Sequence, residues 1–132
     1  MNQRYSHSMG LGGLKILFAA FFVYAALVQI NDPDGVVWMF TYAIAATLTV
    51  MSFFSAYHLV LTAGFCVICI AWSLVVLPAS LESEMSFAKE EPRELFGLLI
   101  IAAWMLWLTV HHRIRQRDDF LSEPAKFPSS PP

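Results

Sequence analysis

The chain has 132 residues, of which 58% are hydrophobic and only 14% are charged, whereas an ordinary soluble domain is nearer half apolar and a quarter charged. This composition argues against a soluble protein and predicts an integral membrane protein that lies in a lipid bilayer. The formal net charge of −2 provides no excess of positive charge for binding nucleic acid, so we predict no nucleic-acid partner.

Four apolar windows account for the excess of hydrophobic residues, and none carries a charge in its interior. Each has about the length needed to cross a hydrocarbon core of ~30 Å as a helix that rises ~1.5 Å per residue. A soluble bundle would need a polar face on most helices, which these windows lack. We predict an all-α integral membrane bundle of four transmembrane helices in two antiparallel hairpins (14–117), with helices at about 14–31, 35–54, 57–77 and 92–117.

The chain begins with a polar segment, 1–13, that contains the glycine-bearing sequence MGLGG. We expect this segment to be loosely ordered or to lie at the membrane interface. The first apolar window lacks a small-x-small cleavage site, and further hydrophobic spans follow it directly. We therefore interpret this window as a retained helix and not as a signal peptide.

A polar stretch, QINDPDG at 29–35, separates the first two windows. Pro33 fixes its own φ and Gly35 tolerates positive φ, so both residues favour a turn. Asp34 is placed to cap the second helix by accepting amide hydrogens at the positive end of the helix dipole. The stretch therefore predicts a tight connection in an antiparallel hairpin.

The second and third windows carry residues suited to close helix packing. Thr41, Ala45 and Thr49 recur at every fourth position of the second window and form a ridge of small residues. Cys66 and Cys69 form a C-x-x-C in the middle of the third window, where zinc or redox chemistry is the alternative to packing. Because no second cysteine pair exists, we favour a packing role for both thiols.

The third helix is expected to end before Pro78, and 78–91 form the longest loop. Pro92 suits the first position of the fourth helix, where its missing N–H is not needed. Glu91 and Glu94 are spaced nearly as in a capping box. The Pro- and Ser-rich tail, 118–132, has four prolines and is expected to be extended.

Positive charge is concentrated beside the two termini, where six of the eight Lys and Arg lie. By the positive-inside rule both termini are predicted to be cytoplasmic, in a plasma membrane or a bacterial inner membrane. The residues Arg113, Arg115 and Arg117 follow the fourth helix, and we expect them to contact lipid headgroups or a partner. Seven of the ten acidic residues lie on the predicted outer side.

The predicted outer face gathers carboxylates at the ends of three helices, and two interpretations remain open for them. They bind a hard cation such as Ca²⁺ or Mg²⁺, or they cap helices with Arg93 as a salt-bridge partner. We favour the second, because the spacing of a calcium loop is absent. The candidate outer-face cluster consists of Gln29, Asn31, Asp32, Asp34, Trp38, Tyr42, Glu91, Arg93 and Glu94.

No sequence motif supports catalysis. The chain has no G-x-S-x-G, no H-E-x-x-H and no phosphate-binding glycine loop, and no histidine lies in the middle of an apolar window. We therefore predict a protein that is not an enzyme, and we assign no catalytic, metal-binding or cofactor-binding residue and no cofactor. An enzyme that uses the outer carboxylates is the alternative.

Three motifs carry a resemblance to a known family. They are QxNDPD at 29–34, the pair Trp38 and Tyr42, and EExRELxGL at 90–98, which leads to Trp104. Over roughly 14–108 the chain resembles the transmembrane protein 220 family of small polytopic membrane proteins. The resemblance implies a membrane protein with several helices, and it implies no activity.

Small size, uncharged helices and small-residue ridges favour an accessory or structural subunit that packs against a larger membrane-protein complex, for instance a respiratory or photosynthetic one, or against copies of itself. The alternative is a membrane protein or carrier that binds an ion or a small molecule through the outer-face carboxylates. Carriers normally place polar groups near the middle of the bilayer, and these windows offer there only threonine, serine and cysteine.

Overall fold

The computed structural model describes residues 2–54, 59–82 and 90–122, and the side chains of 10–54, 59–82 and 92–121. The described chain forms four α-helices, α1 (Asn2–Val28), α2 (Gly35–Met51), α3 (Leu59–Glu82) and α4 (Glu90–Ser122). A short 3-10 helix, η1 (Gln29–Asn31), follows α1. The described residues contain no strand, so the predicted all-α fold class is confirmed.

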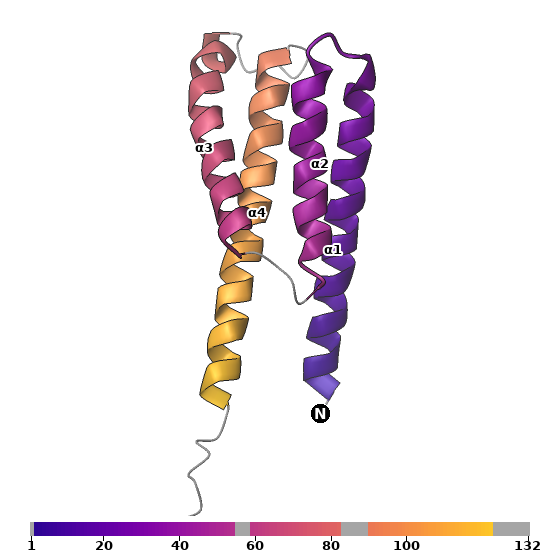
Figure 1. Ribbon diagram of the computed structural model, residues 1–132, viewed down its shortest axis with the longest axis vertical. Coiled ribbons are helices and arrows are strands. Elements are labelled where there is room, and N and C mark those ends of the chain that lie inside the picture. Colours follow the sequence, from indigo (N-terminus) through magenta and orange to yellow (C-terminus); the bar gives the residue numbers. More distant parts are fainter. Residues whose placement is uncertain (1, 55–58, 83–89, 123–132) are drawn as a thin grey trace, which may run out of the picture.

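The helices run alternately up and down (Figure 1). Helices α1 and α2 form one antiparallel hairpin, and α3 and α4 pack closely as a second antiparallel pair. The two pairs meet where α2 faces α4. The beginning of α1 and the end of α4 lie at the same end of the molecule, and the turn between α1 and α2 lies at the opposite end. The two predicted hairpins are therefore present.

Three helical segments are long and apolar enough to cross a membrane: Gly10–Asn31, Leu59–Glu82 and Pro92–Leu121. Helix α2 is also apolar but has only 17 residues. At ~1.5 Å per residue it is about 26 Å long, which is at the short end of the range for a transmembrane helix. The structure thus supports a membrane protein with three long candidate spans and a fourth, shorter apolar helix.

The N-terminal boundary differs from the prediction, because α1 begins at Asn2 and includes most of the segment 1–13. A glycine inside a helix costs only about 1 kcal/mol relative to alanine. Once the apolar part of a helix has formed, each further residue adds a hydrogen bond without a new nucleation cost. The glycines of this segment therefore do not stop the helix.

Helix α2 ends at Met51 and not at residue 54. The following turn closes through backbone hydrogen bonds from Phe53 to Val50 (3.0 Å) and from Phe54 to Met51 (3.0 Å). The Lys15 Nζ donates a hydrogen bond to the Ser52 carbonyl at 2.9 Å. A cation at this position suits the negative end of the helix dipole, so Lys15 of α1 stabilises the end of α2.

Helix α3 continues through Pro78 to Glu82, so the prediction that it ends before Pro78 is wrong. Proline removes its own N–H from the helix ladder, and membrane helices tolerate this loss when neighbouring groups compensate for it. The N–H that Pro78 lacks is the usual partner of the Leu74 carbonyl, whereas the Ser80 hydroxyl donates to the Val76 carbonyl, two positions later, at 3.2 Å. Part of the predicted loop 78–91 is therefore helical, and 83–89 lie outside the described residues.

Helix α4 is longer than predicted at both ends, because it spans Glu90–Ser122 and not 92–117. It includes 118–122 of the segment that was expected to be extended. No proline follows Pro92 until Pro124, and a helix usually ends at or before the residue that precedes a proline. The rest of the tail, 123–132, lies outside the described residues.

The core contains the ridge of small residues on α2 and an aromatic stack that reaches from α1 to α4. Thr41, Ala45 and Thr49 are buried, as the spacing predicts. Phe18 stacks on Trp104 with ring centroids 3.9 Å apart, and the Trp104 Nε1 donates a hydrogen bond to the Thr49 Oγ1 at 2.9 Å. Trp104 thereby connects α4 both to α1 and to α2.

The two cysteines are buried free thiols. The Cys66 Sγ donates a hydrogen bond to the Ala102 carbonyl of α4 at 3.3 Å. Both residues belong to the buried cluster between the helices. The predicted packing role of the C-x-x-C is consistent with this placement.

Candidate functional site

The residue types at positions 32–35 explain the conformation of the turn between α1 and α2. The Gly35 N–H donates to the Asp32 carbonyl at 3.0 Å, and Asp34 has φ −99° and ψ 11°. These features define a type I turn over 32–35, in which Asp is favoured first, Pro second and Gly fourth. Asp32 is extended, with φ −87° and ψ 141°, as expected for a residue before proline.

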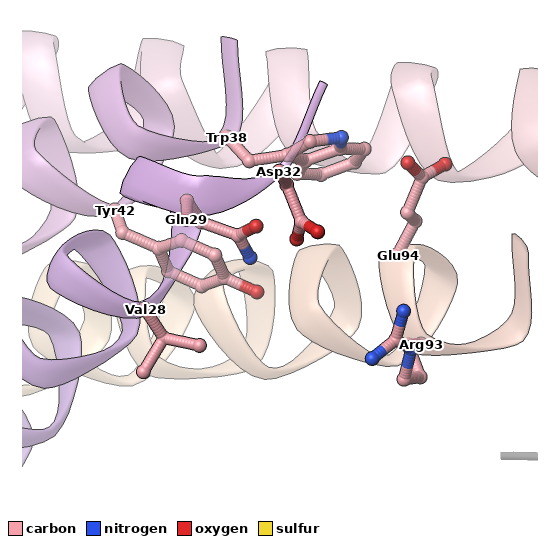
Figure 2. A pocket seen from close by; sticks show the side chains of 7 residues that line it. All are labelled: Val28, Gln29, Asp32, Trp38, Tyr42, Arg93 and Glu94. Carbon is pink, nitrogen blue, oxygen red and sulfur yellow. The ribbon is translucent and has the colours of Figure 1, made fainter. Parts of the chain in front are cut away.

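Gly35 is required by a close approach within this turn. A Cβ at position 35 would overlap the Gln29 carbonyl oxygen, which also accepts a hydrogen bond from the Asp32 N–H at 3.2 Å. Glycine therefore lets the start of α2 pack against the end of α1. The tight turn brings the Gln29 and Asp32 side chains to the same end of the molecule as the start of α2 (Figure 2).

Asp34 occupies the N-cap position of α2, as predicted, but its side chain makes no capping hydrogen bond. A capping residue normally has extended backbone angles, which direct its side chain back toward the first amides of the helix. The turn conformation of Asp34 differs from this geometry. The predicted hydrogen bonds from the helix amides to Asp34 are therefore wrong.

A cavity of about 110 Å³ lies at this end of the molecule. We call it the turn-end cavity. In Figure 2 the Asp32 carboxylate, the Gln29 amide and the Tyr42 hydroxyl point toward one space, which α4 borders. The cavity is lined by Val28, Gln29, Asp32, Trp38, Tyr42, Arg93 and Glu94.

Tyr42 is a buried residue with a polar group at the turn-end cavity, and only 8% of its surface is exposed. Its hydroxyl lies directly against α4 at Gly97, where a Cβ would overlap it. Within the described residues, this hydroxyl forms no hydrogen bond. The glycine thus provides the space in which the Tyr42 hydroxyl reaches the cavity.

Trp38 separates the turn-end cavity from a second, more open cavity of about 410 Å³. Its ring is 7% exposed and packs against Trp72 of α3 with centroids 5.4 Å apart. Asp34 and Glu94 also line this second cavity. Trp38 therefore lies beside other residues of the predicted outer-face cluster, and Trp72 is a neighbour that the sequence pattern did not reveal.

The charges of the turn-end cavity come from different helices. Asp32 precedes α2, whereas Arg93 and Glu94 belong to the first turn of α4. Asp32 and Arg93 line the same cavity, yet no ion pair joins these two described side chains. The expected role of Arg93 as a salt-bridge partner is therefore not observed for Asp32.

The structure brings six members of the predicted outer-face cluster to one cavity: Gln29, Asp32, Trp38, Tyr42, Arg93 and Glu94. Asp34 lies at the second cavity, and Asn31 lines neither. The side chain of Glu91 lies outside the described residues. Val28 and Gly97 were not selected as site residues, although Gly97 belongs to the EExRELxGL motif and a Gly inside a helix often marks a close approach.

The basic residues of α4 lie far from this cavity. Arg113, Arg115 and Arg117 are exposed near the end of α4, at the opposite end of the molecule from the turn (Figure 1). His111 begins this basic run and stacks on Trp107 with centroids 5.2 Å apart. The three arginines are thus placed for contacts outside the chain.

Among the described side chains, no group of three or more His, Cys, Asp or Glu is arranged to hold a metal ion. The turn-end cavity offers two carboxylates, one guanidinium and the donors of Gln29, Trp38 and Tyr42. This set suits recognition of a small polar group by hydrogen bonds and charge.

Comparison with known proteins identifies the same family as the sequence motifs whose residues line this cavity. The model of the family described as "Transmembrane family 220, helix" matches residues 21–110. Transmembrane protein 220 of Xenopus laevis is 36% identical over 107 residues, which cover 75% of this chain. The same stretch covers 58% of that relative, so the chain spans little more than half of the relative's length.

No solved structure matches this chain. The family match covers more than half of the chain, and it includes α2, α3, the last part of α1 from residue 21 and α4 up to residue 110. The residues that line the turn-end cavity all lie within it. The chain therefore belongs to transmembrane family 220.

Proposed function

We propose that this protein is a non-catalytic membrane subunit that packs against a larger membrane-protein assembly, for instance a respiratory or photosynthetic complex. The proposal is supported by an apolar groove of about 330 Å³ between α2 and α3. We call it the α2/α3 groove. Its lining residues are Ile44, Leu48, Val60, Leu61, Gly64, Phe65 and Ile68.

Gly64 is the feature of this groove that favours a helix of a partner over lipid. A Cβ at this position would meet no atom within 4 Å, so packing within the chain does not require glycine here. Small residues on the surface of transmembrane helices let a second helix approach closely. A glycine between Leu61 and Ile68 therefore suits a partner helix.

The apolar surface around the groove is extensive. Val60, Leu61 and Ile68 are each more than half exposed, at 82%, 56% and 58%. A second apolar groove lies between α1 and α4, at Leu17, Phe18, Phe21 and Ile100. Protein interiors are closely packed. Because these grooves between the two hairpins are not filled by the chain itself, we expect side chains of another protein to pack into them.

Site-specific photo-cross-linking in native membranes tests the proposal. A cross-linking residue at Leu61 or Ile68 is expected to give discrete adducts of higher mass, whereas the same residue at Val75, which is 75% exposed outside the groove, is expected to give none. An adduct of twice the mass identifies a second copy of the chain as the partner.

Filling the groove provides a second readout. Gly64→Leu is expected to abolish the adduct at Leu61, and Gly64→Ala is expected to weaken it less, because the smaller side chain blocks less of the surface. Wild-type chain that migrates alone in mild detergent and gives no discrete adduct at either groove position would contradict the proposal.

A further inference from the structure

The turn-end cavity supports an inference that is independent of partner packing. Its most informative group is Tyr42, a residue with only 8% of its surface exposed. The hydroxyl points into the cavity (Figure 2) and forms no hydrogen bond within the described residues. A buried donor without an acceptor is unfavourable, so the cavity calls for an occupant with acceptor oxygens.

Two further donors line the same space. The Trp38 ring is 7% exposed, and within the described chain its indole N–H has no hydrogen-bond acceptor. Arg93 contributes a guanidinium that pairs with no described carboxylate. Arginine and neutral N–H and O–H donors together form a suitable site for a phosphate.

The cavity also presents negative charge. Asp32 lines it without an ion pair to Arg93, and Glu94 adds a second carboxylate. Two opposite charges that share a cavity without contacting each other suit an occupant that carries both signs. A primary ammonium group fits Asp32, because it donates hydrogen bonds to a carboxylate, whereas a trimethylammonium group has no N–H to donate.

Size and position narrow the occupant further. The cavity volume of about 110 Å³ is well below the ~300–1,000 Å³ of sites for drug-sized ligands. The candidate span in α1 ends at Asn31 and the one in α4 begins at Pro92, so the cavity lies where the helices leave the hydrocarbon. Trp and Tyr are enriched at this headgroup level.

We propose that the turn-end cavity binds the headgroup of a phospholipid that carries a primary ammonium and a phosphate, as ethanolamine phospholipids do. Asp32 accepts hydrogen bonds from the ammonium group. Arg93, Tyr42 and Trp38 donate to phosphate oxygens. Gly97 has no side chain and therefore leaves the space that the Tyr42 hydroxyl occupies.

Native mass spectrometry of the full chain, released from nanodiscs with equal amounts of ethanolamine and choline phospholipids, tests the proposal. The wild-type chain is expected to retain ethanolamine phospholipid preferentially. Asp32→Asn, Tyr42→Phe and Arg93→Gln are each expected to lower this retention about tenfold, since each removes a hydrogen bond or charge that contacts an ionised group.

Matched controls separate headgroup binding from loss of fold. Tyr24→Phe changes an exposed tyrosine of α1, and Asp34→Asn changes a carboxylate of the same turn that does not line the cavity. Both controls are expected to retain the lipid as the wild type does. Unchanged circular dichroism in all variants shows that the helices remain formed.

Three results would overturn the inference. Equal retention of ethanolamine and choline phospholipids shows that the headgroup is not recognised. Wild-type retention by Asp32→Asn and Tyr42→Phe shows that the cavity holds water only. Binding of free phosphoethanolamine in choline-lipid nanodiscs, with no competition from added ethanolamine phospholipid, assigns the site to a soluble ligand and excludes the lipid.

Discussion

At the scale of single residues, two glycines determine the geometry of the turn-end cavity. Gly35 lets the start of α2 pack against the Gln29 carbonyl, and Gly97 leaves room for the Tyr42 hydroxyl. The other glycines have open space where a Cβ would lie. Close contacts therefore require glycine at positions 35 and 97, whereas no such contact requires glycine at the other positions.

Gly35→Ala is expected to lower the free energy of unfolding by about 1–3 kcal/mol, because the added methyl group overlaps backbone atoms that cannot move aside easily. Thermal unfolding in detergent, followed by circular dichroism, measures the change. Gly64→Ala is the matched control, since nothing lies within 4 Å of its Cβ; it is expected to stabilise the helix by about 0.5–1 kcal/mol. Equal effects of the two substitutions would refute this role of Gly35.

At the scale of helices, hydrogen bonds and ring contacts join the two hairpins at a few defined positions. Trp104 of α4 stacks on Phe18 of α1 and donates to Thr49 of α2. Thr49 in turn donates to the Ala45 carbonyl at 2.8 Å. The Thr49 hydroxyl therefore acts both as a donor within its helix and as the acceptor that connects α2 to α4.

Thr49→Val keeps the shape of the side chain and removes this acceptor. The substitution is expected to cost about 0.6–2 kcal/mol in the free energy of unfolding, the range for polar contacts between membrane helices. Thr47→Val is the matched control, because the Thr47 hydroxyl bonds only to the Ala43 carbonyl of its own helix, at 2.8 Å on an exposed face. A loss of stability as large for Thr47→Val as for Thr49→Val would contradict the interhelical role. Unfolding curves of both variants in one detergent provide the comparison.

At the scale of the whole molecule, charge is distributed unevenly between the two ends. Arg113, Arg115 and Arg117 lie in the last part of α4, at the same end of the molecule as the beginning of α1, and the turn between α1 and α2, with Asp32 and Asp34, lies at the opposite end (Figure 1). On the basis of the positive-inside rule, we propose that the arginine-bearing end lies in the cytoplasm. The turn-end cavity would then face the other side of the membrane.

Labelling of single cysteines in intact cells tests this orientation. The buried Cys66 and Cys69 are first replaced by alanine, and new thiols are then introduced by Asp34→Cys or Asp118→Cys. A membrane-impermeant maleimide is expected to label position 34 in intact cells and position 118 only after permeabilisation. The reverse pattern would show that the termini lie outside.

The sequence was sufficient to predict the helical membrane class, the two hairpins and the burial of the α2 ridge. It predicted the helix ends less well, because glycine costs a helix only about 1 kcal/mol and proline about 3 kcal/mol relative to alanine, and α1 and α3 continue through these residues. Asp34 is the clearest failure at the site. Its residue type and position indicate a cap, yet the turn that Pro33 and Gly35 impose gives Asp34 backbone angles at which no capping hydrogen bond forms.

Apolar length and charge placement are local properties, so the sequence by itself determined that this chain enters a membrane and where its polar connections lie. Only the tertiary structure decided which polar groups share a cavity. Tyr42 and Gly97 are 55 positions apart, and their contact depends on how α2 packs against α4. The absence of an Asp32–Arg93 ion pair also follows from that packing. The sequence shows only that both charges lie at the same end of the molecule, whereas the packing of the two hairpins determines the distance between them.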